Sequence, residues 1–137
     1  PMAVTIDASV FVNAFSPLEL GSDESLVFIS QLKQQNTPII VPVLVLPEIV
    51  AALSRRQGNP ESAFQLAQEI RSFPAITFIP VDESVANLAV EIAANHRLRG
   101  SDAVYAAVAL RFGTELITLD KEQLERLPKV LSVRKPG

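Results

Sequence analysis

The sequence predicts an α/β protein in which a parallel sheet lies between two layers of helices, a three-layer α/β/α sandwich. Short apolar runs alternate along the chain with longer segments whose apolar residues recur at helical spacing. The short runs are apolar throughout, as is typical of parallel strands covered on both faces. The chain of 137 residues has the length of one ordinary domain, so we expect a single domain over residues 1–137.

The first half of the chain supplies two strands and three helices. Leu26, Ile29 and Leu32 recur at the spacing of one helix face. Pro47 is compatible with a helix only in the first turn, because proline has no backbone N–H to donate. The expected elements are a strand at residues 3–6, a helix at 25–34, a strand at 39–41, and helices at 43–56 and 60–73.

The second half continues the alternation and adds three more strands. Gly100 and Ser101 mark the start of a strongly apolar helix. The carboxyl ends of the strands are the edge of such a sheet where ligand sites gather. The expected elements are a strand at residues 76–79, helices at 83–95 and 101–112, a strand at 115–118, a short helix at 121–127 and a last strand at 130–133.

The composition narrows the class of protein. The chain has no cysteine, which excludes disulfides, zinc fingers and thiol nucleophiles and fits a reducing compartment. Its longest apolar stretch, residues 38–53, is interrupted by Pro42, Pro47 and Glu48, and no basic leader precedes the first strand. We therefore expect a cytoplasmic protein without a membrane partner. The net charge of -3 argues against a long nonspecific nucleic-acid footprint, unless several acids bind divalent cations.

Four acidic residues stand at positions where acids are unusual. Asp7 and Asp120 each follow a strand directly, and Asp102 begins a helix that is otherwise nearly all apolar. Capping of a helix, or attraction to its dipole, explains each of these three without any function. Glu48 is harder to explain, because it is the only charged residue between positions 38 and 53. A buried carboxylate is costly unless it is paired, neutralised or bound to metal.

The four acids together indicate a metal site. Each lies at a strand end or near one, so all four can converge on one edge of the sheet. Converging carboxylates repel one another unless a cation lies between them. Oxygen ligands without cysteine suit Mg²⁺ or Mn²⁺ better than zinc. The candidate metal-binding and catalytic residues are Asp7, Glu48, Asp102 and Asp120.

The sequence resembles the PIN-domain nucleases, in particular the VapC toxins of VapBC-type toxin–antitoxin pairs. The resemblance covers nearly the whole chain. It implies a five-stranded parallel sheet, an endoribonuclease that depends on Mg²⁺ or Mn²⁺, and an antitoxin that blocks the site. It also implies that the last of the four acids is the most variable ligand. The motifs that carry it are Ile6-Asp7-Ala8-Ser9, Pro47-Glu48-Ile49, Leu98-Arg99-Gly100-Ser101-Asp102-Ala103 and Ile117-Thr118-Leu119-Asp120.

Polar residues beside the acids are candidates for supporting roles. Ser9 and Thr118 fall where the family often has hydroxyls near the site, although a helix-start serine and a strand threonine need no function. Arg97, Arg99 and Arg55 are the nearest cations in sequence and can bind RNA phosphates. Arg55 equally fits a helix C-terminus without a ligand. With metal bound, a water would attack phosphorus in line and leave 5′-phosphate and 3′-hydroxyl ends.

Other interpretations remain open at this point. A receiver domain needs a further acidic pair and a lysine after the last strand. Lys135 in Arg134-Lys135 is weak support for that interpretation. A haloacid-dehalogenase-type phosphatase needs an acid where Ser9 stands. The main rival is a non-catalytic PIN-like module that binds RNA or protein and uses its acids as helix caps. We also expect a homodimer, because Phe28 and the helix over 61–73 are more apolar than a small monomer requires.

Overall fold

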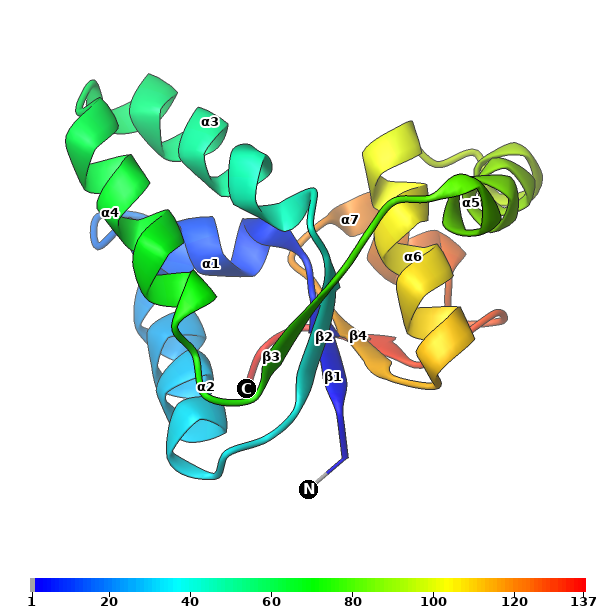
Figure 1. The fold of residues 1–137 in the computed structure, drawn as a ribbon, viewed down its shortest axis with the longest axis horizontal. Helices are drawn as coiled ribbons and strands as arrows, with labels where there is room; N and C mark the ends of the chain where they lie inside the picture. The colour runs from blue at the N-terminus through cyan, green and yellow to red at the C-terminus, as the bar shows by residue number, and fades with distance from the viewer. Residues whose placement is uncertain (1) are drawn as a thin grey trace.

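A parallel five-stranded sheet lies between two layers of helices, which confirms the predicted fold class (Figure 1). The computed structural model describes residues 2–137. The strand order is β3-β2-β1-β4-β5, so β1 is central. The chain adds β2 and β3 on one side of β1 and then crosses to the other side, where it adds β4 and β5. The strands are β1 (Val4–Ile6), β2 (Ile39–Pro42), β3 (Ile76–Ile79), β4 (Glu115–Ile117) and β5 (Val133–Arg134).

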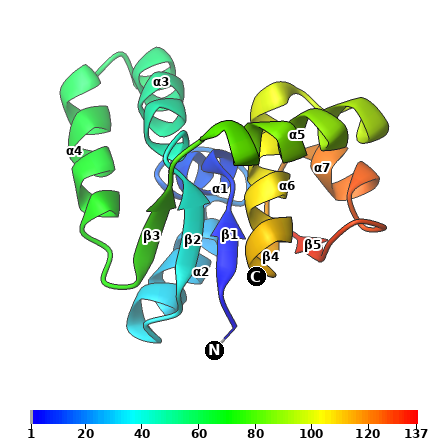
Figure 2. The ribbon, with the colours of Figure 1, turned by 45° about the vertical axis from the view of Figure 1, so that its right-hand side comes forward.

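The helices divide between the two faces of the sheet. Figures 1 and 2 show the first four on one side and the fifth and sixth on the other, with the seventh beside β5. No helix within residues 2–137 is long and apolar enough to cross a membrane. The helices are α1 (Ala8–Ala14), α2 (Ser22–Gln34), α3 (Val45–Gln57), α4 (Pro60–Arg71), α5 (Glu83–His96), α6 (Gly100–Phe112) and α7 (Lys121–Arg126).

The core lies where α6 packs against the central strands. All three residues of β1 are buried, as expected of a central strand in a parallel sheet that is covered on both faces. Ala103, Ala106 and Ala107 on α6 are also buried, and their small side chains let the helix approach β1, β2 and β4 closely. Because β1, β4 and α6 are fixed by this packing, the residues at their ends near the site have little freedom to move.

Three elements differ from the sequence prediction. Residues from Ala8 form the full helix α1, where the sequence indicated only a turn. Helix α2 begins at Ser22 and not at residue 25, because Gly21 adopts a positive φ of 82° that turns the chain into the helix. The last strand is Val133–Arg134 and not 130–133, because the N–H groups of Val130 and Leu131 donate to the carbonyl of Leu127 in a turn.

Helix α3 confirms the expected place of its proline. The helix begins at Val45, so Pro47 lies in the first turn, where its missing N–H costs nothing. Val45, Ile49 and Leu53 are buried against the core. The expectation that this helix is largely buried holds for that face only, because Glu48 on the adjacent face is half-buried and borders a cavity.

Candidate active site

The four acids predicted from the sequence border one cavity of about 520 Å³ at the carboxyl edge of the sheet. Each acid comes from a different part of the fold, so the topology and not the local sequence brings them together. Asp7 follows β1, Glu48 lies in the first turn of α3, Asp102 lies in the first turn of α6, and Asp120 precedes α7.

Asp7 is held by hydroxyl groups and does not cap its helix. It stands at the N-cap position of α1, yet its side chain makes no capping hydrogen bond. Its Oδ2 accepts hydrogen bonds from Ser9 Oγ and Thr118 Oγ1, both at 2.8 Å. Those hydroxyls accept in turn from the N–H groups of Leu119 and Asp120 at 3.1 and 3.0 Å. Simple capping therefore does not explain Asp7, and the two hydroxyls fix its orientation.

Burial and negative neighbours make the charged forms of two acids costly. The pKa of Asp7 is raised from 3.8 to about 6, chiefly by burial, and the charges of Asp102 and Glu48 add to the rise. The hydrogen bonds from Ser9 and Thr118 oppose it. Burial also raises the pKa of Asp102, with a further contribution from Asp120. Such mutual repulsion is what a bound cation would relieve.

Glu48 is oriented by Tyr105, a residue that the sequence analysis missed. The Tyr105 hydroxyl donates to Glu48 Oε1 at 2.7 Å, and the tyrosine side chain is fully buried. Burial and the charges of Asp7 and Glu48 raise the pKa of Tyr105, so its hydroxyl stays a donor. One signal could have found it: the only tyrosine of the chain lies in an apolar helix, where a buried hydroxyl needs a partner.

Arg99 links the two remaining acids. Its Nε donates to Asp102 Oδ2 at 3.1 Å, and its Nη2 donates to Asp120 Oδ2 at 3.0 Å. Asp120 Oδ1 also accepts from the N–H of Gln123 at 2.9 Å, which is the helix cap that the sequence suggested. Both oxygens of Asp120 are therefore engaged.

The remaining carboxylate oxygens test whether a metal ion fits. Within residues 2–137, no group of three or more acidic or histidine side chains already has the close arrangement of an ion-binding cluster. Three acids nevertheless each keep one oxygen without a hydrogen bond from residues 2–137: Asp7 Oδ1, Glu48 Oε2 and Asp102 Oδ1. All three side chains border the same cavity. Oxygen ligands of this kind suit a hard divalent cation, so the chemistry of these three side chains fits such an ion.

The candidate RNA-binding arginines separate into two groups. Arg55 and Arg99 line the cavity with the acids, and so does Arg56, which pairs with Glu19. Arg97 does not line it. It ends α5 with a positive φ of 53°, its carbonyl accepts a bond from Arg126, and it borders another cavity.

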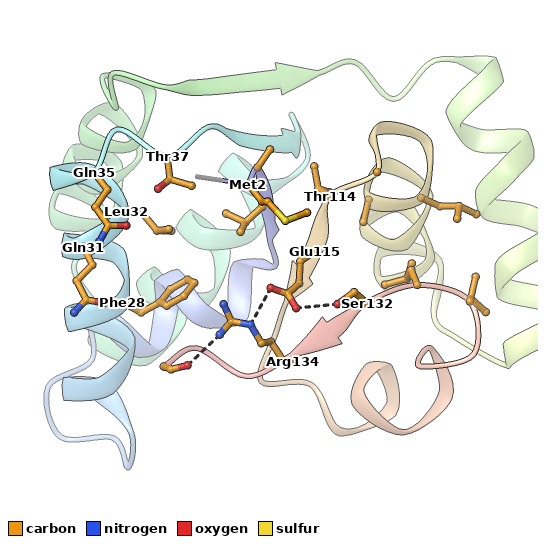
Figure 3. Close-up of a pocket in the computed structure, with 18 residues that line it drawn as sticks. Met2, Phe28, Gln31, Leu32, Gln35, Thr37, Thr114, Glu115, Ser132 and Arg134 are labelled. Carbon is orange, nitrogen blue, oxygen red and sulfur yellow. Dashed lines mark hydrogen bonds and ion pairs between the residues drawn. The ribbon is translucent and has the colours of Figure 1, made fainter.

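A larger cavity of about 690 Å³ lies at the opposite, amino edge of the sheet (Figure 3). Figure 3 shows its one acidic side chain, Glu115, accepting hydrogen bonds from Arg134 and Ser132. The Glu115 carboxylate is thus satisfied by its neighbours, and the acids that could bind metal lie elsewhere.

Comparison with known proteins agrees with the sequence resemblance. The family model of the PIN domain matches residues 4–130. The chain belongs to the PIN domain family. This membership removes the receiver-domain and haloacid-dehalogenase interpretations of the sequence.

The PIN domain is similar over its whole length to proteins of toxin–antitoxin systems. Ribonuclease VapC3 of Pyrobaculum aerophilum is 24% identical over 131 residues, which cover 96% of this chain and 99% of that protein. VapBC2 from Rickettsia felis, solved with a DNA fragment from its promoter, superposes with a TM-score of 0.73 at 16% identity and covers 98% of each chain. VapC20 of Mycobacterium tuberculosis, a toxin that cleaves the sarcin-ricin loop, gives 0.70 at 20% identity over 86% of this chain and 90% of that one. The predicted resemblance to VapC-type proteins is confirmed.

Proposed function

We propose that this PIN domain is an endoribonuclease that depends on Mg²⁺ or Mn²⁺ and acts as the toxin of a toxin–antitoxin pair. The observation that carries the proposal is the set of carboxylates on one cavity. Asp7, Glu48 and Asp102 come from three separate parts of the fold, line this cavity, and each keep one oxygen free of hydrogen bonds from residues 2–137. The curated relative named as a ribonuclease supports the same reaction.

The chain's own residues would hold the metal in a fixed place. Asp7, Glu48 and Asp102 are the core ligands, and Asp120 is a fourth ligand. Bound Mg²⁺ or Mn²⁺ lowers the pKa of water enough to supply hydroxide near neutral pH for phosphodiester hydrolysis. Ser9 and Thr118 orient Asp7, whose Oδ2 they already engage.

Two arginines would hold the RNA backbone over the acids. Arg99 and Arg55 line the same cavity, and a guanidinium can contact a phosphate through two donors at once. Tyr105 keeps Glu48 from turning away, since it engages Oε1 and leaves Oε2 for the metal. Arg97 borders another cavity. It would contact RNA only if the RNA chain continued past the acids and along α5.

The proposal predicts cleavage of RNA in the presence of Mn²⁺ and none in EDTA. The purified protein is incubated with labelled RNA, and the product ends are mapped. Attack by water leaves 5′-phosphate and 3′-hydroxyl ends. Cleavage that persists undiminished in EDTA would exclude this mechanism, and tight RNA binding without Mn²⁺-dependent cleavage would favour the non-catalytic module.

The same proposal includes an antitoxin partner and a cytoplasmic location. Several structures with this fold are complexes of toxin–antitoxin pairs, among them one from Klebsiella pneumoniae. A partner that covers the cavity would block the acids from RNA. Cellular RNA, the proposed substrate, is found in the cytoplasm.

A homodimer is also part of the proposal, although most of the apolar residues that we expected at its interface, Phe28 and those of the helix over 61–73, are buried. Phe28 is buried against the core and cannot contribute to an interface. Other apolar side chains are exposed to solvent. Leu18 and Leu20 are fully exposed, and Phe64 on α4 is 60% exposed. Exposed apolar groups favour association when they form contiguous patches. We expect a dimer by analytical sedimentation at micromolar concentration, and a monomer there would count against it.

A further inference from the structure

Arg99 engages the acids at the place where a cation is expected. Its guanidinium spans two carboxylates, with Nε at 3.1 Å from Asp102 Oδ2 and Nη2 at 3.0 Å from Asp120 Oδ2. Asp102 lies in the first turn of α6, and Asp120 is the N-cap residue of α7. Arg99 therefore neutralises charge between two acids that would otherwise repel each other.

The oxygens that Arg99 engages are oxygens that a metal ion would need. Asp120 has no other oxygen to offer, because its Oδ1 caps α7 through the N–H of Gln123. Asp102 would keep only Oδ1. With Arg99 in place, Asp7, Glu48 and Asp102 each keep one oxygen for a divalent cation, whereas Asp120 can offer one only if Arg99 leaves or the cap of α7 is broken.

We propose that Arg99 competes with the divalent cation for Asp102 and Asp120. The cation must displace the Arg99 guanidinium before Asp120 and both oxygens of Asp102 can bind it. This inference rests on the proposed metal site and adds a control on its loading. The arginine side chain is 71% exposed, so it can swing into solvent without disturbing the core. Because Arg99 is the N-cap residue of α6, the displaced guanidinium stays beside the same cavity.

Arg55 offers a matched control for the charge of Arg99. Arg55 lines the same cavity, and within residues 2–137 it has no ion pair with an acid. Replacing either arginine with glutamine removes one positive charge near the acids. The loss of long-range repulsion between that charge and a bound cation should strengthen cation binding slightly in both variants. Only the Arg99 substitution also frees the two carboxylate oxygens.

The test is Mn²⁺ binding to the whole protein, measured by isothermal titration calorimetry at fixed pH and salt. Because the Arg99 side chain is mostly exposed to solvent, its two ion pairs are modest in strength, and we expect Arg99→Gln to bind Mn²⁺ roughly tenfold more tightly than wild type. Arg55→Gln should gain much less. Arg99→Lys should fall between wild type and Arg99→Gln, because one ammonium cannot span both carboxylates as the planar fork does.

Each outcome decides the inference. An Arg99→Gln protein that binds Mn²⁺ no more tightly than Arg55→Gln would overturn it and leave the proposed nuclease in place. A wild type that binds no Mn²⁺ would overturn the proposed metal site and this inference together. Circular dichroism confirms the fold of each variant, and Arg99→Ala replaces Arg99→Gln if the latter does not fold.

Discussion

Replacing Asp7 with asparagine is expected to abolish Mn²⁺-dependent RNA cleavage and to make the protein more stable at neutral pH. Asparagine keeps an oxygen for Ser9 and Thr118, so the local hydrogen bonds survive. It loses the charge that would bind the cation. Cleavage should fall by at least roughly 10²–10³-fold, the cost of removing one stabilising hydrogen-bond donor from an active site. Asp102→Asn should reduce cleavage in the same way.

The gain in stability should depend on pH. The pKa of Asp7 is about 6 in the folded protein against an ordinary 3.8, so the folded state binds the proton more tightly than the unfolded state. Wild-type stability contributed by protonated Asp7 is therefore lost as pH rises from about 4 to about 6, by up to ~3 kcal/mol. The Asp7→Asn protein has no proton to lose at this position. Its free energy of unfolding should therefore exceed that of wild type only slightly at pH 4 and by the full amount at pH 7.

Urea unfolding of both proteins at pH 4, 5, 6 and 7, without divalent metal, measures this difference. Asp23→Asn is a suitable control, because Asp23 is an exposed acid on α2 outside the cavity. It should change neither cleavage nor the pH dependence. An Asp7→Asn protein that cleaves RNA at the wild-type rate would remove Asp7 from the site.

The sheet could be predicted well, because a run of apolar residues is a strong local feature of the sequence. Runs of apolar residues placed four of the five strands to within one residue, and apolar residues at helical spacing placed six of the seven helices in residues 2–137 within a few residues. Residues 130–133 are the exception. Their apolar run predicts a strand, but hydrogen bonds to the carbonyl of Leu127 keep the first part of it in a turn.

The convergence of the four acids could be predicted, because acids at strand ends are visible in the sequence. Asp7, Glu48, Asp102 and Asp120 do border one cavity. How their oxygens are used could not be predicted, since that depends on contacts between residues far apart in the chain. The bond from Tyr105 to Glu48 spans 57 residues, and the bond from Thr118 to Asp7 spans 111.

A second large effect is expected at Glu48. Glu48→Gln keeps the shape and an oxygen for Tyr105 but removes the charge. Repulsion from Asp7 and Asp102 then falls, so melting in EDTA should occur at a higher temperature than for wild type. Cleavage should fall by roughly 10²–10³-fold. Glu69→Gln, which changes an exposed acid on α4, should leave melting and cleavage as in wild type.

The shift in melting temperature caused by Mn²⁺ tests most directly whether these carboxylates form one metal site. A ligand that binds only the folded state at 100 times its Kd stabilises it by ~2.7 kcal/mol, and tenfold weaker binding removes about half of that. Wild type should therefore melt several degrees higher with Mn²⁺, and Glu48→Gln should lose about half of this shift or more, together with cleavage. A Glu48→Gln protein whose Mn²⁺ shift and RNA cleavage both equal those of wild type would contradict the proposed site.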